Sequence, residues 1–152
     1  ITPKEAIKNG ERNFIILSIG NKNEMKNEIL SLCPDANVIV FEPITKEITL
    51  NIANQIQEKR IESVSIWGID NISDYFSSHE TIKNLKINNY VDSKATIAQK
   101  FNNLDVITPK EAIKNGERNF IILSIGNKNE MKNEILSLCP DANVIVFENE
   151  FS

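Results

Sequence analysis

The first part of the chain alternates between short apolar runs and a segment with apolar residues at helical spacing. Residues 14–19 and 38–41 are nearly continuous apolar runs, which is typical of parallel strands buried on both faces. Between them, apolar residues follow a helical pattern from Glu24 to Cys33, and Pro34 ends that helix. Two strands joined through a helix pack as a right-handed parallel crossover. The pattern therefore predicts a strand-helix-strand unit.

A short helix is predicted ahead of the first strand. Thr2 is a capping residue, a proline follows it at the first helical position, and Glu5 stands three residues after the cap. Asn9 and Gly10 end the helix after Lys8. The predicted order is thus helix, strand, helix, strand.

This whole segment occurs twice. Residues 1–42 recur without a change as residues 107–148. Diverged structural repeats keep only scattered positions, so these 42 consecutive identities mark a duplicated sequence. Since 42 of the 152 residues are a duplicate, 110 residues are unique, which is enough for one hydrophobic core.

Residues 43–106 lie between the two copies and supply further elements. Ile48, Ile52 and Ile56 fall four apart and predict an amphipathic helix, which we expect to connect the first copy to the rest over residues 43–60. The other predicted elements are a strand at 63–67, a helical stripe at 72–79, a strand at 87–92 and a loop or short turn at 94–104.

The element order predicts the fold class. From residue 61 to residue 148 it reads strand, helix, strand, short helix, strand, helix, strand, which is typical of an α/β fold with a mainly parallel sheet. We expect residues 61–148 to form a small, doubly wound, Rossmann-like unit. The duplicated strand-helix-strand half precedes it at residues 1–42, and residues 149–152 form a tail.

Composition and charge narrow the range of partners. Apolar residues make up 41% and charged residues 25%, the balance of a soluble globular domain. The net charge is −4 and the lysines are scattered among glutamates, which argues against nucleic acid as a partner. No apolar run reaches the roughly 20 residues of a membrane span. The first residues lack the charged-then-apolar pattern of a leader, so we expect none. We therefore expect a cytoplasmic location.

The two cysteines, Cys33 and Cys139, occupy the same position of the two copies. The repeated segment thus contains one thiol and offers no disulfide framework. We expect this residue to be a small buried apolar side chain.

Four segments of the second half follow one another in an order and spacing that resemble a known family. These segments are residues 64–68, 90–92, 106–111 and 120–124. Together they resemble the small Rossmann-like modules attached to bacterial glycosyltransferases, methyltransferases and acetyltransferases of surface-polysaccharide synthesis. The resemblance covers Ser63 to Phe147. It implies a domain similar to nucleotide-binding domains that is often an accessory to a separate catalytic domain.

The loop after residues 63–67 departs from a dinucleotide-binding loop. Such a loop needs three glycines, and here only Gly68 is present, with Asp70 at the second position. Two like charges about 4 Å apart, at an effective dielectric near 20, repel by roughly 4 kcal/mol. Pyrophosphate binding is therefore disfavoured. In the alternative interpretation, Asp70 or Asn71 caps the following helix.

Asp92 lies 24 residues beyond Gly68, near the position of the ribose-binding carboxylate in dinucleotide folds. In the alternative interpretation, which the incomplete glycine loop favours, Asp92 caps a turn at the strand end. Gly68, Asp70, Asp92 and Gly126 make up the predicted binding site at the carboxyl ends of the strands, with a weakly bound sugar nucleotide as the ligand and no identified cofactor.

The sequence offers no catalytic or metal-binding set. His79 is the one histidine, and it has no cysteine or carboxylate at metal-ligand spacing except Glu80, which points elsewhere on a helix. No nucleophile motif accompanies it. We expect His79 to lie at a helix boundary. Trp67 could stack on a base, but a lone aromatic residue at a strand end usually packs in the core.

An alternative interpretation places the ligand in the first copy. Gly20 follows a strand, and Glu42 ends the next strand 22 residues later, a pattern that resembles methyltransferases that bind S-adenosylmethionine. On this interpretation Glu42 and Glu148 bind the ligand. The glycine loop is again incomplete, because Gly20 is followed by residues 21–23, Asn-Lys-Asn.

We expect a Rossmann-like accessory module without catalytic activity. Its partners are another protein domain, a sugar nucleotide, or a second copy of the chain that associates through residues 1–42, since those apolar strands would otherwise be exposed. The alternative is a fragment of an S-adenosylmethionine-dependent methyltransferase.

Overall fold

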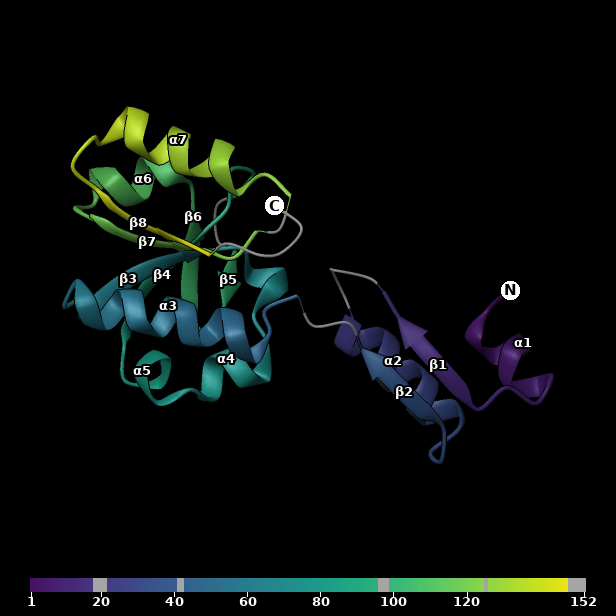
Figure 1. Ribbon diagram of the computed structural model, residues 1–152. Helices are drawn as coiled ribbons and strands as arrows, with labels where there is room; N and C mark the ends of the chain where they lie inside the picture. Colours follow the sequence, from purple (N-terminus) through teal and green to yellow (C-terminus); the bar gives the residue numbers. More distant parts are fainter. Residues whose placement is uncertain (18–21, 41–42, 96–98, 125, 148–152) are drawn as a thin grey trace. The chain divides into compact units, whose positions relative to one another are not determined.

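The computed structural model describes residues 1–17, 22–40, 43–95, 99–124 and 126–147. The chain divides into two compact units, Ile1–Pro43 and Ile44–Ser152. We call the first the half-unit and the second the full unit (Figure 1).

The half-unit contains two helices and a two-stranded parallel sheet. Its elements are α1 (Pro3–Lys8), β1 (Asn13–Ile16), α2 (Lys22–Leu32) and β2 (Asn37–Val40). The side-chain oxygen of Thr2 caps α1 by accepting a hydrogen bond from the Glu5 nitrogen, as the sequence predicts. The predicted order of helix, strand, helix and strand is confirmed over the described residues.

The full unit is a mixed α/β structure with a six-stranded, mostly parallel sheet. Its helices are α3 (Lys46–Glu58), the short 3-10 helix η1 (Ile69–Asn71), α4 (Asp74–Ser78), α5 (Glu80–Lys83), α6 (Pro109–Lys114) and α7 (Lys128–Leu138). Its strands are β3 (Ser63–Trp67), β4 (Lys86–Val91), β5 (Lys100–Phe101), β6 (Leu104–Ile107), β7 (Asn119–Ile122) and β8 (Asn143–Val146). The strand order is β5-β6-β4-β3-β7-β8, and β5 alone among the paired strands runs antiparallel to its neighbour.

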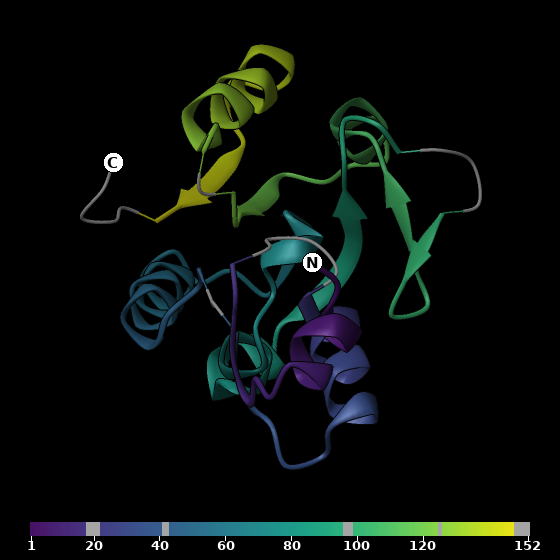
Figure 2. The same cartoon turned by 90° about the vertical axis from the view of Figure 1, so that its right-hand side faces the viewer.

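Helices cover both faces of this sheet. Helices α3, α4 and α5 lie on one face, and α6 and α7 lie on the other (Figures 1 and 2). Side chains alternate along each strand between two core clusters, one on each face. In β7, for example, Ile121 belongs to the cluster that contains α3, whereas Phe120 and Ile122 belong to the cluster that contains α7.

The prediction of a loop or short turn at 94–104 is wrong in part, because this segment contributes to a β-hairpin. Strand β5 pairs with β6 through a turn at Asn102 and Asn103, whose φ angles are 48° and 65°. Asparagine tolerates this left-handed region, and two such residues form the tight turn of a hairpin. Strand β6 then lies beside β4, so the predicted order from residue 61 onward missed both strands.

Helix α3, which the sequence predicts as a connection, packs into the core of the full unit. Ile52 is fully buried and Ile56 is 3% exposed. The side-chain oxygen of Thr45 caps the helix by accepting from the Ile48 nitrogen. None of the helices in the described parts of the chain is both long enough and apolar enough to cross a bilayer.

Candidate functional site

The candidate site lies at the carboxyl ends of β3 and β7, where the strand order reverses. From β3 the chain continues to β4 on one side, whereas β7 lies on the other side of β3 and is followed by β8. In open α/β sheets, ligands bind outside the carboxyl ends of the strands at such a switch point. The predicted residues Gly68, Asp70 and Asp92 follow β3 and β4, and Gly126 follows β7.

Gly68 allows the turn after β3 to press against the end of β7. Its φ angle is 114°, a left-handed conformation that favours glycine. A Cβ atom at this position would lie 3.1 Å from the Cβ of Leu123 and 3.2 Å from its carbonyl carbon. The glycine is therefore required for packing of protein on protein.

Asn71 bridges the two strands across the switch point. Its amide nitrogen Nδ2 donates a hydrogen bond of 2.6 Å to the main-chain oxygen of Leu123. The side chain is buried, and its Oδ1 atom has no hydrogen-bond partner among the described residues. A buried side chain of the protein itself thus links the segments that follow β3 and β7.

The helical segment after β3 is broken into short pieces. Helix η1 has three residues and α4 has five. The side chain of Ser73, not of Asp70 or Asn71, caps α4 by accepting from the Phe76 nitrogen at 3.1 Å, so the alternative in which one of those two residues caps the helix is wrong. A helix N-terminus binds phosphate through the aligned amides of a longer helix. The short helices η1 and α4 therefore do not favour phosphate binding here.

Asp92 and Gly126 lie in different local settings. Asp92 is half-buried, and its Oδ1 accepts a hydrogen bond of 2.9 Å from the main-chain nitrogen of Lys94, which is a turn-capping role. Gly126 is exposed, with open space where a Cβ would stand. Ribose or sugar binding by these residues stays a prediction.

The other singled-out residues have structural roles. His79 lies between α4 and α5, and its Nδ1 accepts from the Thr81 nitrogen at 3.2 Å, which confirms a helix-boundary position. Trp67 is 5% exposed and packs in the core with Phe120 and Ile122, which confirms the packing interpretation. No group of three or more metal-ligating side chains occurs among the described residues.

Both cysteines are buried, as predicted, and each also makes a hydrogen bond that the sequence analysis missed. The Cys139 thiol donates to Oδ1 of Asp141 at 3.0 Å, and Cys33 makes the same contact with Asp35. The hydrogen bond to Asp141, followed by burial, raises the pKa of the Cys139 thiol. The same bond lowers the pKa of Asp141.

A basic pocket along β8 was not predicted from the sequence. It has a volume of about 450 Å³ and is lined by Lys59, Lys128, Lys132 and Gln55, among others. The Lys128 ammonium is buried 4.7 Å from the centroid of the Phe147 ring and has no hydrogen-bond partner within the described ranges. The spacing of four between Lys128 and Lys132, on one helix face, is the signal that could have revealed it.

Gly20, Glu42 and Glu148, which the methyltransferase interpretation requires, lie outside the described residues. At the described switch point, the carboxylates of Asp70 and Asp92 follow β3 and β4. Comparison with known proteins finds no match to a protein-family model, to a curated protein or to a solved structure.

Proposed function

We propose that the chain carries a Rossmann-like accessory module that acts by packing against another protein domain and has no catalytic activity of its own. Two features support a Rossmann-like fold. The five parallel strands, numbered along the chain, have the order 3-2-1-4-5, which matches the first five strands of the order 3-2-1-4-5-6 of dinucleotide-binding folds, and helices cover both faces. The place in cytoplasmic synthesis of cell-surface sugars rests on the resemblance of residues 64–68, 90–92, 106–111 and 120–124 to modules of those enzymes.

The hydrogen bond between Asn71 and Leu123 carries the proposal. A dinucleotide lying across the carboxyl ends of β3 and β7 would have to displace the buried Asn71 side chain and leave the Leu123 carbonyl oxygen unpaired. Gly68 presses on the same residue, so the backbone of this turn cannot also approach a pyrophosphate. The switch point is therefore better suited to holding β3 and β7 together than to enclosing a ligand.

Weak binding of a sugar nucleotide at the rim of the switch point is a second part of the proposal. Asp70 is exposed and Asp92 is half-buried, and sugar hydroxyls are suitable donors to carboxylates. The same charges oppose the phosphates. We therefore expect millimolar rather than micromolar affinity.

Isothermal titration calorimetry with a nicotinamide dinucleotide, S-adenosylmethionine and several sugar nucleotides tests the proposal. The unaltered chain is expected to show no saturable binding of the dinucleotide or of S-adenosylmethionine at micromolar concentrations. Asp70→Gly, which removes a charge without touching the core, should strengthen any dinucleotide binding, and Asp92→Ala should weaken binding of a sugar nucleotide. Submicromolar affinity of the unaltered chain for the dinucleotide, or turnover of S-adenosylmethionine abolished by Glu42→Ala or Glu148→Ala, would contradict the proposal.

A further inference from the structure

The two identical segments, residues 1–42 and 107–148, have opposite surroundings. Ile15, Leu17 and Ile39 of the half-unit are 69%, 73% and 64% exposed. Their equivalents in the full unit, Ile121, Leu123 and Ile145, are all fully buried against the layer that contains α3. The half-unit therefore presents an exposed apolar sheet face. In the full unit, the layer that contains α3 covers the equivalent face.

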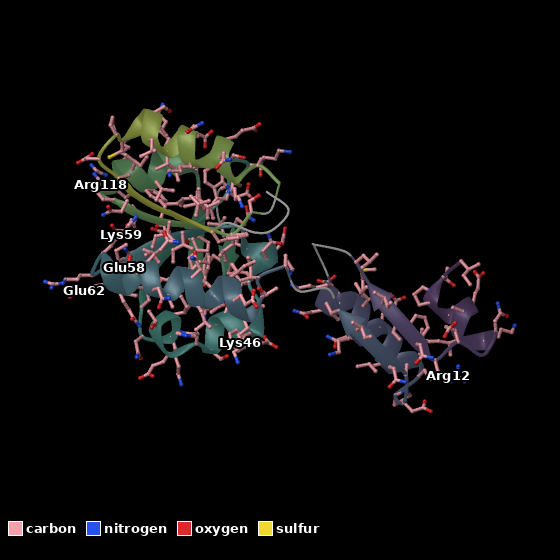
Figure 3. All side chains as sticks on the ribbon, in the orientation of Figure 1. Arg12, Lys46, Glu58, Lys59, Glu62 and Arg118 are labelled. Atoms are coloured by element: carbon pink, nitrogen blue, oxygen red, sulfur yellow. The ribbon has the colours of Figure 1, made fainter. Side chains whose placement is uncertain are left out.

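Over the described residues, the first segment has the same helices and strands as the second. Its helices and strands have the same bounds after an offset of 106 residues. Arg12 and Arg118, both labelled in Figure 3, each donate from Nη1 at 3.1 Å to the carbonyl oxygen of an equivalent isoleucine. Asn37 and Asn143 each donate across the strand pair, at 3.0 and 2.9 Å. No local rearrangement is needed for one segment to resemble the other.

The second segment is held in the full unit by groups that the first segment also carries. Strand β7 pairs with β3 in the register Ile66 to Ile121. Glu117 Oε2 accepts hydrogen bonds from the Ser65 hydroxyl at 2.8 Å and from the Asn88 amide at 2.9 Å. The corresponding Glu11 accepts from the main-chain nitrogens that follow it and keeps its other oxygen available for such contacts.

The chain connection is compatible with an exchange of the two segments. Helix α3 lies beside β8 in the full unit (Figure 1). Along its length α3 packs on β8, with Gln55 Nε2 donating to the Val146 oxygen at 3.2 Å. Residues 41–43 join Val40 to Ile44, and because four such steps span up to about 14 Å, the exchange requires this connection to be extended.

We propose that residues 1–42 exchange with residues 107–148 of the same chain for the single place beside β3. In the second arrangement β1 pairs with β3, β2 becomes the edge strand beside α3, and the segment 107–148 becomes the half-unit. Both arrangements present the same side chains to β3 and α3, because the exchanged sequences are identical, whereas the pairing of Ile107 with Val91 in β6 depends on the chain connection. Their populations then depend on the two chain connections alone, one through residues 41–43 and the other through β6 and α6.

Paired substitutions test this exchange. Ile121→Asp places a charge in the core of the arrangement described above, and Ile15→Asp places the same charge on the exposed face of the half-unit. We expect each single variant to keep the emission of the buried Trp67 and a cooperative thermal transition, whereas the double variant loses both. Loss of both signals in Ile121→Asp alone would overturn the proposal. Retention of both in the double variant would overturn it too, since the place beside β3 would then need neither segment.

Thiol labelling gives a second measurement without a disruptive charge. Ile121→Cys is introduced into a chain in which Cys33 and Cys139 are replaced by alanine. Exchange brings position 121 to the surface, so we expect labelling under native conditions at least about tenfold faster than global unfolding followed by Trp67. Labelling no faster than global unfolding would overturn the proposal.

The dependence on concentration distinguishes exchange within a chain from exchange between chains. We expect the labelling rate, and the thermal midpoint of Ile121→Asp, to stay constant over about a hundredfold range of chain concentration below that at which light scattering detects association. A rate or a midpoint that rises with concentration would show that a second copy supplies the segment, and would overturn exchange within one chain.

Discussion

The side-chain nitrogen of Asn71 donates a hydrogen bond of 2.6 Å to the main-chain oxygen of Leu123, across the point where the strand order reverses. Asn71→Ala removes this donor and leaves a buried carbonyl oxygen without its partner. We expect the free energy of unfolding to fall by about 1–3 kcal/mol, measured by urea denaturation. The exposed neighbour Asp70 provides the control, since Asp70→Ala should change the free energy of unfolding by less than about 0.5 kcal/mol. Equal effects of the two substitutions would show that the hydrogen bond does not stabilise the switch point.

Removal of residues 1–43 is expected to leave a folded protein that no longer self-associates. The two core clusters of the full unit consist of residues from Ile44 onward, whereas the bare apolar face belongs to the half-unit. We expect residues 44–152 to keep the circular dichroism of the full unit, and light scattering to show association of the entire chain only. An unfolded 44–152 fragment, together with a strictly monomeric entire chain, would contradict this prediction.

Gly68→Ala is expected to destabilise residues 44–152 more than Gly116→Ala does. Both glycines have a left-handed backbone, with φ angles of 114° and 99°, which costs an alanine about 1–2 kcal/mol. A Cβ at Gly116 meets open space, whereas one at Gly68 meets Leu123 at 3.1 Å. Overpacking should therefore add about 1–3 kcal/mol at Gly68. Thermal and urea denaturation of the two variants measure the difference, which should vanish if the turn can move away from β7.

The Cys139 thiol is expected to make stability depend on pH on the alkaline side. Its pKa is raised in the folded state by the hydrogen bond to Asp141 and by burial. The resulting stabilisation is complete below the ordinary thiol pKa of about 8.5 and is lost as pH rises through the higher folded value. In residues 44–152, Cys139→Ala should flatten this alkaline loss in the urea midpoint. An unchanged pH profile would contradict the prediction.

Alkylation of the same thiol provides a matched test. Asp141→Asn removes the carboxylate that raises the pKa of Cys139, so the thiolate fraction and the alkylation rate at a pH of about 8.5 should increase. The pKa of Asp141 is itself lowered by the hydrogen bond from Cys139, so its contribution is present above about pH 3.9 and is lost as pH falls through the folded value. Asp141→Asn should therefore also reduce the acid sensitivity of the urea midpoint.

Apolar runs and capping residues predicted the elements whose ends are determined by residues close in the sequence. The strand at 63–67 has its predicted bounds, and the predicted cap at Thr2 lies where the first helix begins. The hairpin of β5 and β6 was missed, because a two-residue strand shows no periodicity and gains its hydrogen bonds only from its partner. Its signal was the pair Asn102 and Asn103.

The roles of single side chains at the switch point depend on distant partners. Asn71 bonds a carbonyl group 52 residues away, and nothing in its local sequence distinguishes that role from a helix cap. Glu11 and Glu117 have identical neighbours, yet Glu117 is buried between Ser65 and Asn88 and Glu11 is exposed. Identical local sequence cannot predict different burial, because the difference lies in what else packs there.

The hairpin gives the sheet two unlike borders. At one border, β5 has only two residues, and Lys100 pairs with Asp105 at 3.9 Å, which blunts that edge. At the other border, β8 is a four-residue edge strand, and among the described side chains Gln55 covers one of its carbonyl groups. A strand from outside would therefore add more readily at β8 than at β5. Any filament built by adding strands to this unit would grow from one side and have a direction.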